Sequence, residues 1–220
     1  TGSRFLRGVN CVGGVALDLS GLQLAQVEVE LNTLEQDFSA IEKIVFANAS
    51  LTERLENTGI LTEGIAWDHA VIGVVGRASG IDRDLRRDRP FAAYDVLQPK
   101  VALYRYGDVR ARMRVRLDEI HESIRLIREV RRGLPLGRLV TRPMHEAQPG
   151  VWALSAVEGW RGEILYVVMA GDAGRIHRCK VRDPSFVNWP AIQWAALGNI
   201  VPDFPLINKS FNLSYVGNDL

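Results

Sequence analysis

The stretch VWALSAVEGWRGEILYVVMAGDAGRIHRCKVR, residues 151–182, marks the point where the hydrophobic period of the chain changes. Upstream of it, apolar residues recur every three or four positions, whereas here they fall in short runs. The runs are separated by turn-forming stretches at residues 160–162 and 171–174. Short apolar runs between glycine-containing turns are typical of antiparallel strands. We therefore predict three short strands that follow a helical region.

Two long helices are predicted before these strands. From about residue 18 to residue 57 the apolar residues keep steps of three and four, which places them on one helix face that Asp18 or Ser20 could cap and Gly59 could end. This heptad face consists of Leu24, Val27, Leu31, Leu34, Phe38, Ile41 and Val45. Three heptads more often mean a core helix of a bundle than a coiled coil.

A second long helix is predicted over residues 108–132, where Gly133 and Pro135 would end it. Its buried face is predicted to hold Val109, Met113, Leu117, Ile120, Ile124 and Ile127. Residues 59–106, rich in glycine, proline and charge, indicate a long irregular connection with one short helical piece near residues 62–71.

A last helix is predicted over residues 189–197, after the start signal Asn188-Trp189-Pro190. The order of elements describes an α+β, mainly α chain: a long-helix bundle with a small antiparallel three-stranded sheet. We expect one unit over residues 1–220, with a helical part at 18–134, the sheet at 151–182 and a C-terminal part at 188–220.

Composition excludes several classes of function. The formal charge of +1 gives no electrostatic reason to expect nucleic acid as a partner. The only cysteines, Cys11 and Cys179, form no CxxC pair, so a reducing, cytoplasmic setting is the default. No apolar run approaches the roughly 20 residues of a membrane-spanning helix. Any membrane association is therefore expected to go through other subunits.

Motifs for common catalytic chemistries are missing from the sequence. GVNCVGG and GVVGRASG are rich in glycine, but neither is a GxGxxG motif that opens a helix directly after a strand, and the sequence has no GKS or GKT. No GxSxG serine elbow accompanies a plausible base. The four histidines lack metal-ligand spacing, so surface or hydrogen-bonded roles are the simpler interpretation; they are His69, His121, His145 and His177.

Two arginine-rich stretches allow a plain and a functional interpretation. RASGIDRDLRRDRP, residues 77–90, is either a solvated loop with weak ion pairs or a loop whose arginines hold carboxylates at a subunit boundary. The arginines of residues 110–132 are most simply interpreted as a solvated or subunit-facing helix surface, because no aromatic residues lie among them as nucleic-acid binding would require.

Several stretches occur in an order that resembles one family: TGSRFLRGVN, GVVGRASGIDRDLRRDRPFAAYD, RYGDVRARMRVRLDEIHESIRLI, VRDPSFVNWPAI and VPDFPLINKSFNLSYVGND. Together they resemble the large subunit of membrane-bound nickel-iron hydrogenases, including formate hydrogenlyases, and the quinone-proximal large subunit of respiratory complex I. The resemblance spans nearly the whole chain. It implies a hydrogenase large-subunit-like fold, and it implies that this chain corresponds only to the C-terminal portion.

The resemblance also implies where a site would lie. Hydrogenases of this family end the region with Ser-x-Asp-Pro-Cys-x-x-Cys, whose thiolates hold nickel and iron. On that pattern Asn212 and Leu213 take the Asp-Pro places, while Ser214 and Gly217 take the two cysteine places. The expectation is a degenerate metal-ligand turn with no metal. A remnant of the family site is expected at Arg77, Ser79, Gly80 and Asp84, where an architectural role is an equal alternative.

Two hypotheses follow. The first is a subunit of a membrane-associated oxidoreductase complex, NADH:quinone oxidoreductase-like or formate hydrogenlyase-like, peripheral on the inner face of the cytoplasmic membrane. The chain would bind no cofactor, and the family context implies quinone, NAD(H) and iron-sulfur clusters in partners: an iron-sulfur small subunit and membrane subunits. The alternative is a non-catalytic structural or assembly subunit that retains the fold.

Overall fold

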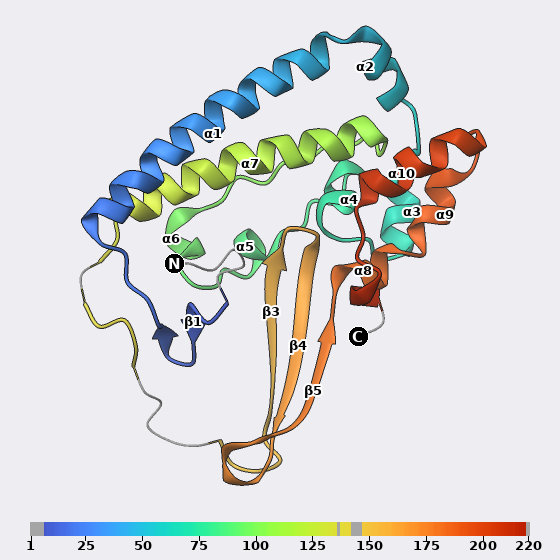
Figure 1. Ribbon diagram of the computed structural model, residues 1–220. Helices are drawn as coiled ribbons and strands as arrows, with labels where there is room; N and C mark the ends of the chain where they lie inside the picture. The colour runs from blue at the N-terminus through green and yellow to red at the C-terminus, as the bar shows by residue number, and fades with distance from the viewer. Residues whose placement is uncertain (1–6, 136, 142–146, 219–220) are drawn as a thin grey trace.

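The computed structural model describes residues 7–135, 137–141 and 147–218. The first stretch of the family pattern up to Leu6, His145 and the last two residues lie outside these ranges. Two long helices, α1 (Gly21–Ala47) and α7 (Val109–Arg132), run side by side, and a three-stranded sheet extends away from them (Figure 1). The fold is therefore α+β and mainly α, as predicted.

The helix expected over residues 18–57 is divided in two. Ser20 and Gln23 form a capping box at the start of α1, so the predicted cap is confirmed. At Asn48 the backbone is extended and the side chain accepts a hydrogen bond from the backbone N–H of Leu51, which starts α2 (Ala49–Leu55). The prediction of one continuous helix was wrong, because Asn48 offers its own cap in mid-pattern.

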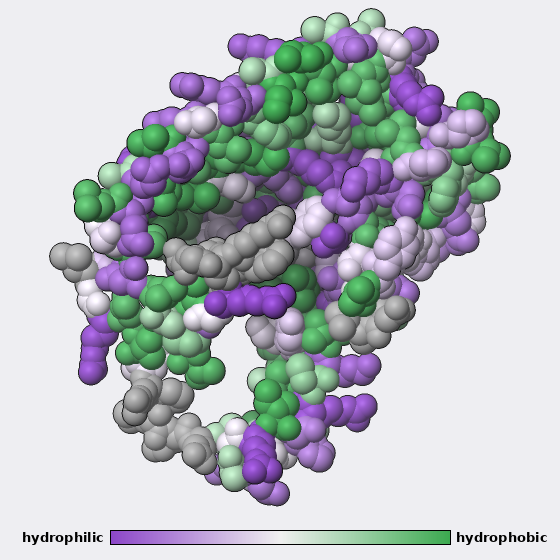
Figure 2. Space-filling model, viewed as in Figure 1, coloured by the Kyte–Doolittle hydropathy of each residue, from purple (hydrophilic) through white to green (hydrophobic). Residues whose placement is uncertain are grey.

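The predicted apolar face of α1 is covered in part: Leu24, Val27, Phe38 and Val45 are half-buried. Leu31 is the buried residue of the helix, whereas Leu34 and Ile41 are 50% and 56% exposed. Figure 2 shows apolar and charged side chains side by side over α1. Periodicity correctly placed these residues on one face but did not show whether the chain itself covers that face.

Helix α7 follows the prediction closely. Asp108 caps it by accepting a hydrogen bond from the backbone N–H of Ala111, and Gly133 ends it. Val109, Leu117 and Ile124 are buried as expected, although Ile127 is 43% exposed. Arg112 is also fully buried in α7, so the interpretation of its arginines as a solvated surface was wrong for this residue.

The connection between the long helices is less irregular than predicted. It contains four short helices: α3 (Glu63–Asp68), α4 (Gly73–Ala78), α5 (Leu85–Asp88) and α6 (Tyr94–Leu97). Every residue of α4 is buried. Apolar residues of this connection and of the C-terminal helices share the main hydrophobic core, which includes Leu61, Val71, Val75, Ile192, Ile207 and Phe211.

The sheet has the predicted three strands, β3 (Trp152–Gly159), β4 (Gly162–Ala170) and β5 (Ile176–Arg182), paired antiparallel in that order. A turn of 3-10 helix, η1 (Asp172–Gly174), joins the last two strands. The register places Glu158 opposite Glu163, so two acidic residues share one face at the end of the sheet nearest the helices. A small hairpin, β1 (Asn10–Cys11) with β2 (Gly14–Val15), was not predicted.

The C-terminal region contains more helix than predicted. The expected helix over residues 189–197 corresponds to α9 (Ala191–Ala196), and α8 (Pro184–Asn188) and α10 (Phe204–Phe211) flank it. Short 3-10 turns, η2 (Val201–Asp203) and η3 (Val216–Asn218), complete the described chain. Among the described residues, no helix has the length and apolar character needed to cross a membrane.

Candidate functional site

Arg77 lies at the centre of a buried cluster of charges. Its guanidinium is 1% exposed and donates to Glu119 at 2.5 Å and to Glu158 at 3.0 Å, while Asp84 lies 3.5 Å away. These partners come from α7, from β3 and from the residue that precedes α5. One side chain of α4 therefore joins three elements that lie far apart in the sequence.

Asp84 has a second arginine partner. It is fully buried, receives two hydrogen bonds from the Arg86 guanidinium at 2.6 and 2.9 Å, and caps α5 by accepting from the backbone N–H of Arg86. The backbone N–H of Leu85 donates to the other oxygen of Glu158. The loop at residues 77–90 thus holds carboxylates in the interior, and the interpretation of this part as a solvated loop was wrong.

Burial and charge act in opposite directions on these groups. Burial alone would raise the pKa of Asp84, but the hydrogen bonds from Arg86 and the charge of Arg77 outweigh it and hold the pKa below its ordinary value. Burial raises the pKa of Glu158, the charge of Arg77 opposes the rise, and the charge of Asp84 adds to it. Two carboxylates of one cluster are thus shifted in opposite directions.

The other two residues of the expected remnant lie beside Arg77 but outside its hydrogen bonds. Ser79 is fully buried, and its hydroxyl has no hydrogen-bond partner among the described residues. Gly80 has φ +96, and a Cβ there would lie 2.9 Å from a carboxylate oxygen of Glu63. Of the four expected residues, the structure brings Arg77 and Asp84 into contact.

The C-terminal turn is built from hydrogen bonds. Asn212 has the left-handed conformation, with φ 54, that ends α10. The Ser214 hydroxyl accepts from the backbone N–H of Gly217 at 2.9 Å, and the backbone N–H of Ser214 donates to the Ser185 hydroxyl at 2.9 Å. The expected ligand positions therefore lie together in one ordered turn.

These residues do not fit a nickel-iron centre. Ser214 offers a hydroxyl, which is not a ligand for soft metals, and its oxygen already serves the turn. Gly217 offers no side chain, and a Cβ at this position would lie 2.6 Å from the carboxyl carbon of Asp183. No group of three or more His, Cys, Asp or Glu side chains in the described part of the chain is arranged to hold a metal ion. Cys11 and Cys179 are both exposed and free.

An arginine between two strands touches this turn, and sequence reasoning missed it. Arg161, between β3 and β4, donates from Nε to the backbone oxygen of Asn212 at 2.7 Å and stacks on Trp160 at 3.9 Å. From the other side Arg116 donates to the backbone oxygen of Phe211. Burial lowers the pKa of Arg116 to about 10, a carboxylate at Glu119 opposes the shift, and the charge of Arg161 adds to it.

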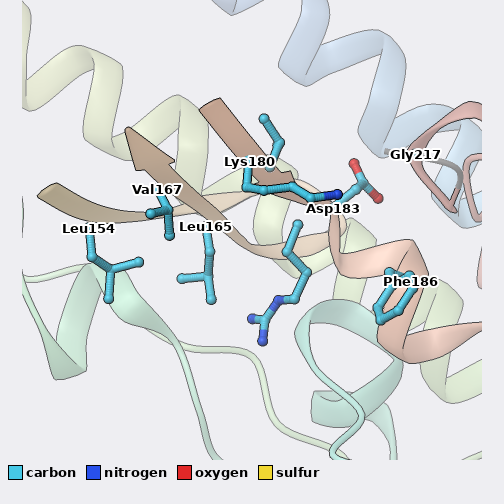
Figure 3. A pocket seen from close by; sticks show the side chains of 9 residues that line it. Leu154, Leu165, Val167, Lys180, Asp183, Phe186 and Gly217 are labelled. Carbon is cyan, nitrogen blue, oxygen red and sulfur yellow. The ribbon is translucent and has the colours of Figure 1, made fainter. Parts of the chain in front are cut away.

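An apolar cavity of about 290 Å³ lies next to the turn (Figure 3). Leu154, Leu165 and Val167 of the sheet form one side, and Phe186 and Gly217 contribute to the wall near the C-terminus. Lys180, Arg182 and Asp183 add charged groups to its lining. The cavity therefore combines an apolar floor with polar groups, an arrangement typical of sites for organic ligands.

The Arg77 cluster and the C-terminal turn are connected through backbone packing. Gly73, at the start of α4, lies so close to the turn between β3 and β4 that an added Cβ would be 2.0 Å from the backbone oxygen of Arg161. The Asn188 side chain bonds both backbone groups of Ile72. No hydrogen bond or ion pair among the described residues joins Arg77 directly to Ser214 or Gly217.

Comparison with known proteins places the chain in a family. The model of the family described as respiratory-chain NADH dehydrogenase, 49 Kd subunit, matches residues 1–151 and 144–219. Formate hydrogenlyase subunit 5 of Escherichia coli (strain K12) is 30% identical over 219 residues, which cover 100% of this chain and 38% of that protein. A subunit of the NADH-quinone oxidoreductase of Clostridium beijerinckii is 30% identical over 96% of this chain and 57% of that protein.

A solved structure agrees with this match. A chain of the membrane-bound sulfane sulfur reductase, an archaeal respiratory membrane complex, superimposes with a TM-score of 0.85 at 25% sequence identity, covering 94% of this chain and 58% of the other. The chain thus spans roughly two fifths to three fifths of the length of these relatives. The protein belongs to the family of the respiratory-chain NADH dehydrogenase 49 kDa subunit.

Proposed function

We propose that this chain is a subunit of a membrane-associated respiratory-type oxidoreductase complex, similar to NADH:quinone oxidoreductase or formate hydrogenlyase, and that its C-terminal turn works without nickel. The observation that carries the proposal is the turn itself. In it the Ser214 hydroxyl accepts a hydrogen bond from the backbone N–H of Gly217, and these are the two residues that the family pattern would place where hydrogenases carry cysteines.

The proposal extends to partners and location. An iron-sulfur small subunit and membrane subunits would surround the chain, and iron-sulfur clusters and NAD(H) would be bound by those partners. The chain would lie peripherally on the cytoplasmic face of the membrane. The names of the relatives support this, because one is part of an NADH-quinone oxidoreductase and another belongs to a respiratory membrane complex.

Residues near the turn are suited to an organic acceptor such as a quinone. The apolar floor formed by Leu154 and Val167 would accept a ring, and Lys180 could donate to a carbonyl oxygen. Arg161 uses only its Nε in a hydrogen bond among the described residues, so its two terminal nitrogens are open for donation. In this proposal Lys180 orients the acceptor in the cavity, Arg161 holds the C-terminal turn beside it, and partner subunits deliver the electrons.

The second candidate function is a structural subunit, and the buried Arg77 cluster favours it. A guanidinium that joins α4, α7 and β3 is also what a scaffold would need to hold its elements in register. A scaffold would contribute packing surfaces to the complex and no group to its chemistry. The two candidates make different predictions for variants near the cavity.

The deciding experiment replaces Lys180, which lines the cavity, in the native host. The tagged complex would be purified from membranes of cells carrying wild-type chain, Lys180→Ala, or the control Arg178→Ala, which changes an exposed arginine of β5 outside the cavity lining. If the chain takes part in the chemistry, Lys180→Ala should leave subunit composition unchanged and lower quinone reduction at least tenfold, while the control keeps its activity. Unchanged turnover in both variants would support the scaffold.

Metal content provides a separate test. Stoichiometric nickel in the purified wild-type chain would contradict the interpretation of Ser214 and Gly217 as positions that no longer bind metal. Purification from native membranes without any iron-sulfur partner would contradict the assembly part of the proposal.

A further inference from the structure

The buried cluster around Arg77 contains more acidic groups than basic ones. Asp84, Glu119 and Glu158 carry three carboxylates, and their side chains are 0%, 16% and 5% exposed. The guanidiniums that pair with them inside the protein belong to Arg77 and Arg86, which are 1% and 13% exposed. If all five groups were ionised, together they would carry one net negative charge in a region shielded from water.

Groups around this core offset the charge of Glu158 only weakly. The charge of Arg116 acts on Glu119, but its guanidinium bonds the backbone oxygens of Arg112 and Phe211 and forms no ion pair among the described residues. Glu163 lies opposite Glu158 in the sheet and pairs with Arg83 and Arg182. Those arginines are 54% and 34% exposed, and their carboxylate partner is Glu163. Asp88 accepts from the backbone N–H of Asp84 and pairs with Arg87 near the surface. Partners at the surface are screened by water, so they compensate a buried charge weakly.

Glu158 is the member of the cluster with the weakest compensation. Asp84 receives two hydrogen bonds from Arg86, and Glu119 has the shortest contact with Arg77 and reaches closest to water. Glu158 shares Arg77 with both of them, and its other hydrogen-bond donor is the backbone N–H of Leu85. Each of its oxygens accepts one hydrogen bond, which leaves a lone pair on each for a proton.

The centre of the cluster also contains an unused donor. Arg77 Nε is buried and has no hydrogen-bond partner among the described residues, so the guanidinium does not meet all of its hydrogen-bonding capacity with the carboxylates around it. Most buried polar groups have a hydrogen-bond partner, so this unpaired donor marks the cluster as incompletely satisfied.

We propose that the Arg77 cluster is a proton-binding site of the folded chain, in which Glu158 takes up and releases the proton while Asp84 and Glu119 stay ionised. Uptake removes the negative charge of Glu158 and leaves Arg77 paired with Glu119 and Asp84. The site lies where α4, α5, α7 and β3 meet, so its occupancy changes the attraction between the sheet and the helices. The proposal does not depend on the redox function, since it concerns groups of this chain alone.

The direction in which burial shifts the pKa of Glu158 agrees with the geometry. Desolvation disfavours the charged carboxylate, and the neighbouring Asp84 carboxylate repels it. Because the groups are coupled, the observed titration belongs to the cluster, and removal of one carboxylate should change the titration of another.

The test is an NMR titration of the 220-residue chain labelled with ¹³C at the glutamate side-chain carboxyl carbon. We expect one glutamate signal whose midpoint lies above the ordinary value of about 4.3, and we expect it to be lost in Glu158→Gln. In Glu119→Gln the same signal should shift to a lower midpoint, because one of the repelling carboxylates is gone. Glu129→Gln, at a position 44% exposed on α7, is the matched control and should leave the signal unchanged.

Two outcomes overturn the proposal. One is a wild-type spectrum in which no glutamate titrates above the ordinary value. The other is a raised signal that persists in Glu158→Gln. If Glu158→Gln does not fold, the wild-type titration and the response to Glu119→Gln decide, because a purely structural ion pair would show neither the raised midpoint nor the downward shift.

Discussion

The effect of the buried Arg77 side chain on stability depends on the carboxylates that pair with it. Taking a guanidinium and three carboxylates out of water costs several kcal/mol for each ion, and their mutual attraction returns this only when the geometry is good. The contacts of Arg77 with Glu119 and Glu158, at 2.5 and 3.0 Å, meet this condition. The cluster therefore adds specificity to the fold more than net stability.

Replacing Arg77 by methionine should destabilise the chain strongly. The substitution keeps an unbranched side chain but leaves the carboxylates of Asp84, Glu119 and Glu158 without their shared partner, and such a loss costs about 3–5 kcal/mol. The free energy of unfolding from urea denaturation measures it. Arg87→Met is the control: its ion pairs lie at the surface, so a change of about 0–1 kcal/mol is expected. Equal small effects in both variants would contradict the role given to Arg77.

The two shifted carboxylates should give the stability opposite dependences on pH. The folded pKa of Asp84 is lowered, so its contribution is present above the unfolded value of about 3.9 and is lost as pH falls through the folded pKa. The folded pKa of Glu158 is raised, so its contribution is present below about 4.3 and is lost as pH rises through the folded pKa.

Glu158→Gln isolates the second effect. The ordinary pKa of glutamate is about 4.3, and the wild type loses the Glu158 contribution as pH rises above that value. Glutamine does not titrate, so the free energy of unfolding of the variant should not decline over this pH range. Urea denaturation at a series of pH values provides the comparison. The wild-type and variant curves should converge in slope at low pH, and parallel curves over the whole range would show that Glu158 has its ordinary pKa.

At the scale of elements, the contact between α4 and the β3–β4 turn determines where Arg77 lies. Gly73 has φ +66, and its Cα packs against the backbone of Arg161 and Gly162. The glycine is needed for both reasons: its conformation is unfavourable for other residues, and no space exists for a side chain. The turn that places Arg161 beside Asn212 is therefore fixed by the helix that carries Arg77.

Gly73→Ala should cost at least about 2 kcal/mol, since it combines left-handed backbone strain with an overlap against backbone atoms that have little freedom to move. Gly64→Ala is the control because it lies in α3 with open space around it, and it should stabilise by about 0.5–1 kcal/mol. Thermal unfolding of both variants measures the difference. A Gly73→Ala variant as stable as wild type would mean that α4 and the turn do not touch.

The sequence predicted those elements whose signals are local. Helix α7 has caps at both ends and a continuous apolar period, and strands β3 to β5 are separated by strong turns, so both were found. Asn48 was missed because a cap inside a periodic segment looks like any other polar residue.

The candidate site was found in part for a similar reason. Arg77 and Asp84 lie in one short motif, so the resemblance found them, whereas Glu119 and Glu158 are 42 and 81 residues away from Arg77. Only the folded chain shows that these two carboxylates share its guanidinium. Arg161 and the cavity beside Gly217 depend in the same way on contacts between distant segments.

At the scale of the whole molecule, several ion pairs join α1 to α7. Arg128 pairs with Glu28 and Glu35 of α1, Arg131 also pairs with Glu28, and Arg114 pairs with Glu42. Apolar packing adds to them, since Leu31 is buried and Leu24, Val27 and Phe38 are half-buried. The side chains of these pairs are 19–39% exposed, so dissolved salt reaches and screens them.

Helix α1 should therefore open more often than α7, and more often still in salt. At 1 M ionic strength the screening length is about 3 Å, so each pair would lose much of a contribution that is at most about 1 kcal/mol. Hydrogen exchange read by mass spectrometry should show faster exchange for residues 24–44 than for residues 111–127, and a several-fold acceleration in salt confined to the first segment.

Glu28→Gln removes ion pairs with two arginines and should accelerate the exchange of α1 even at low salt. Glu30→Gln is the control and should not, because its carboxylate bonds only Gln26 among the described residues. Equal protection of the two helices at both salt concentrations would show that apolar packing, and not charge, holds α1 in place.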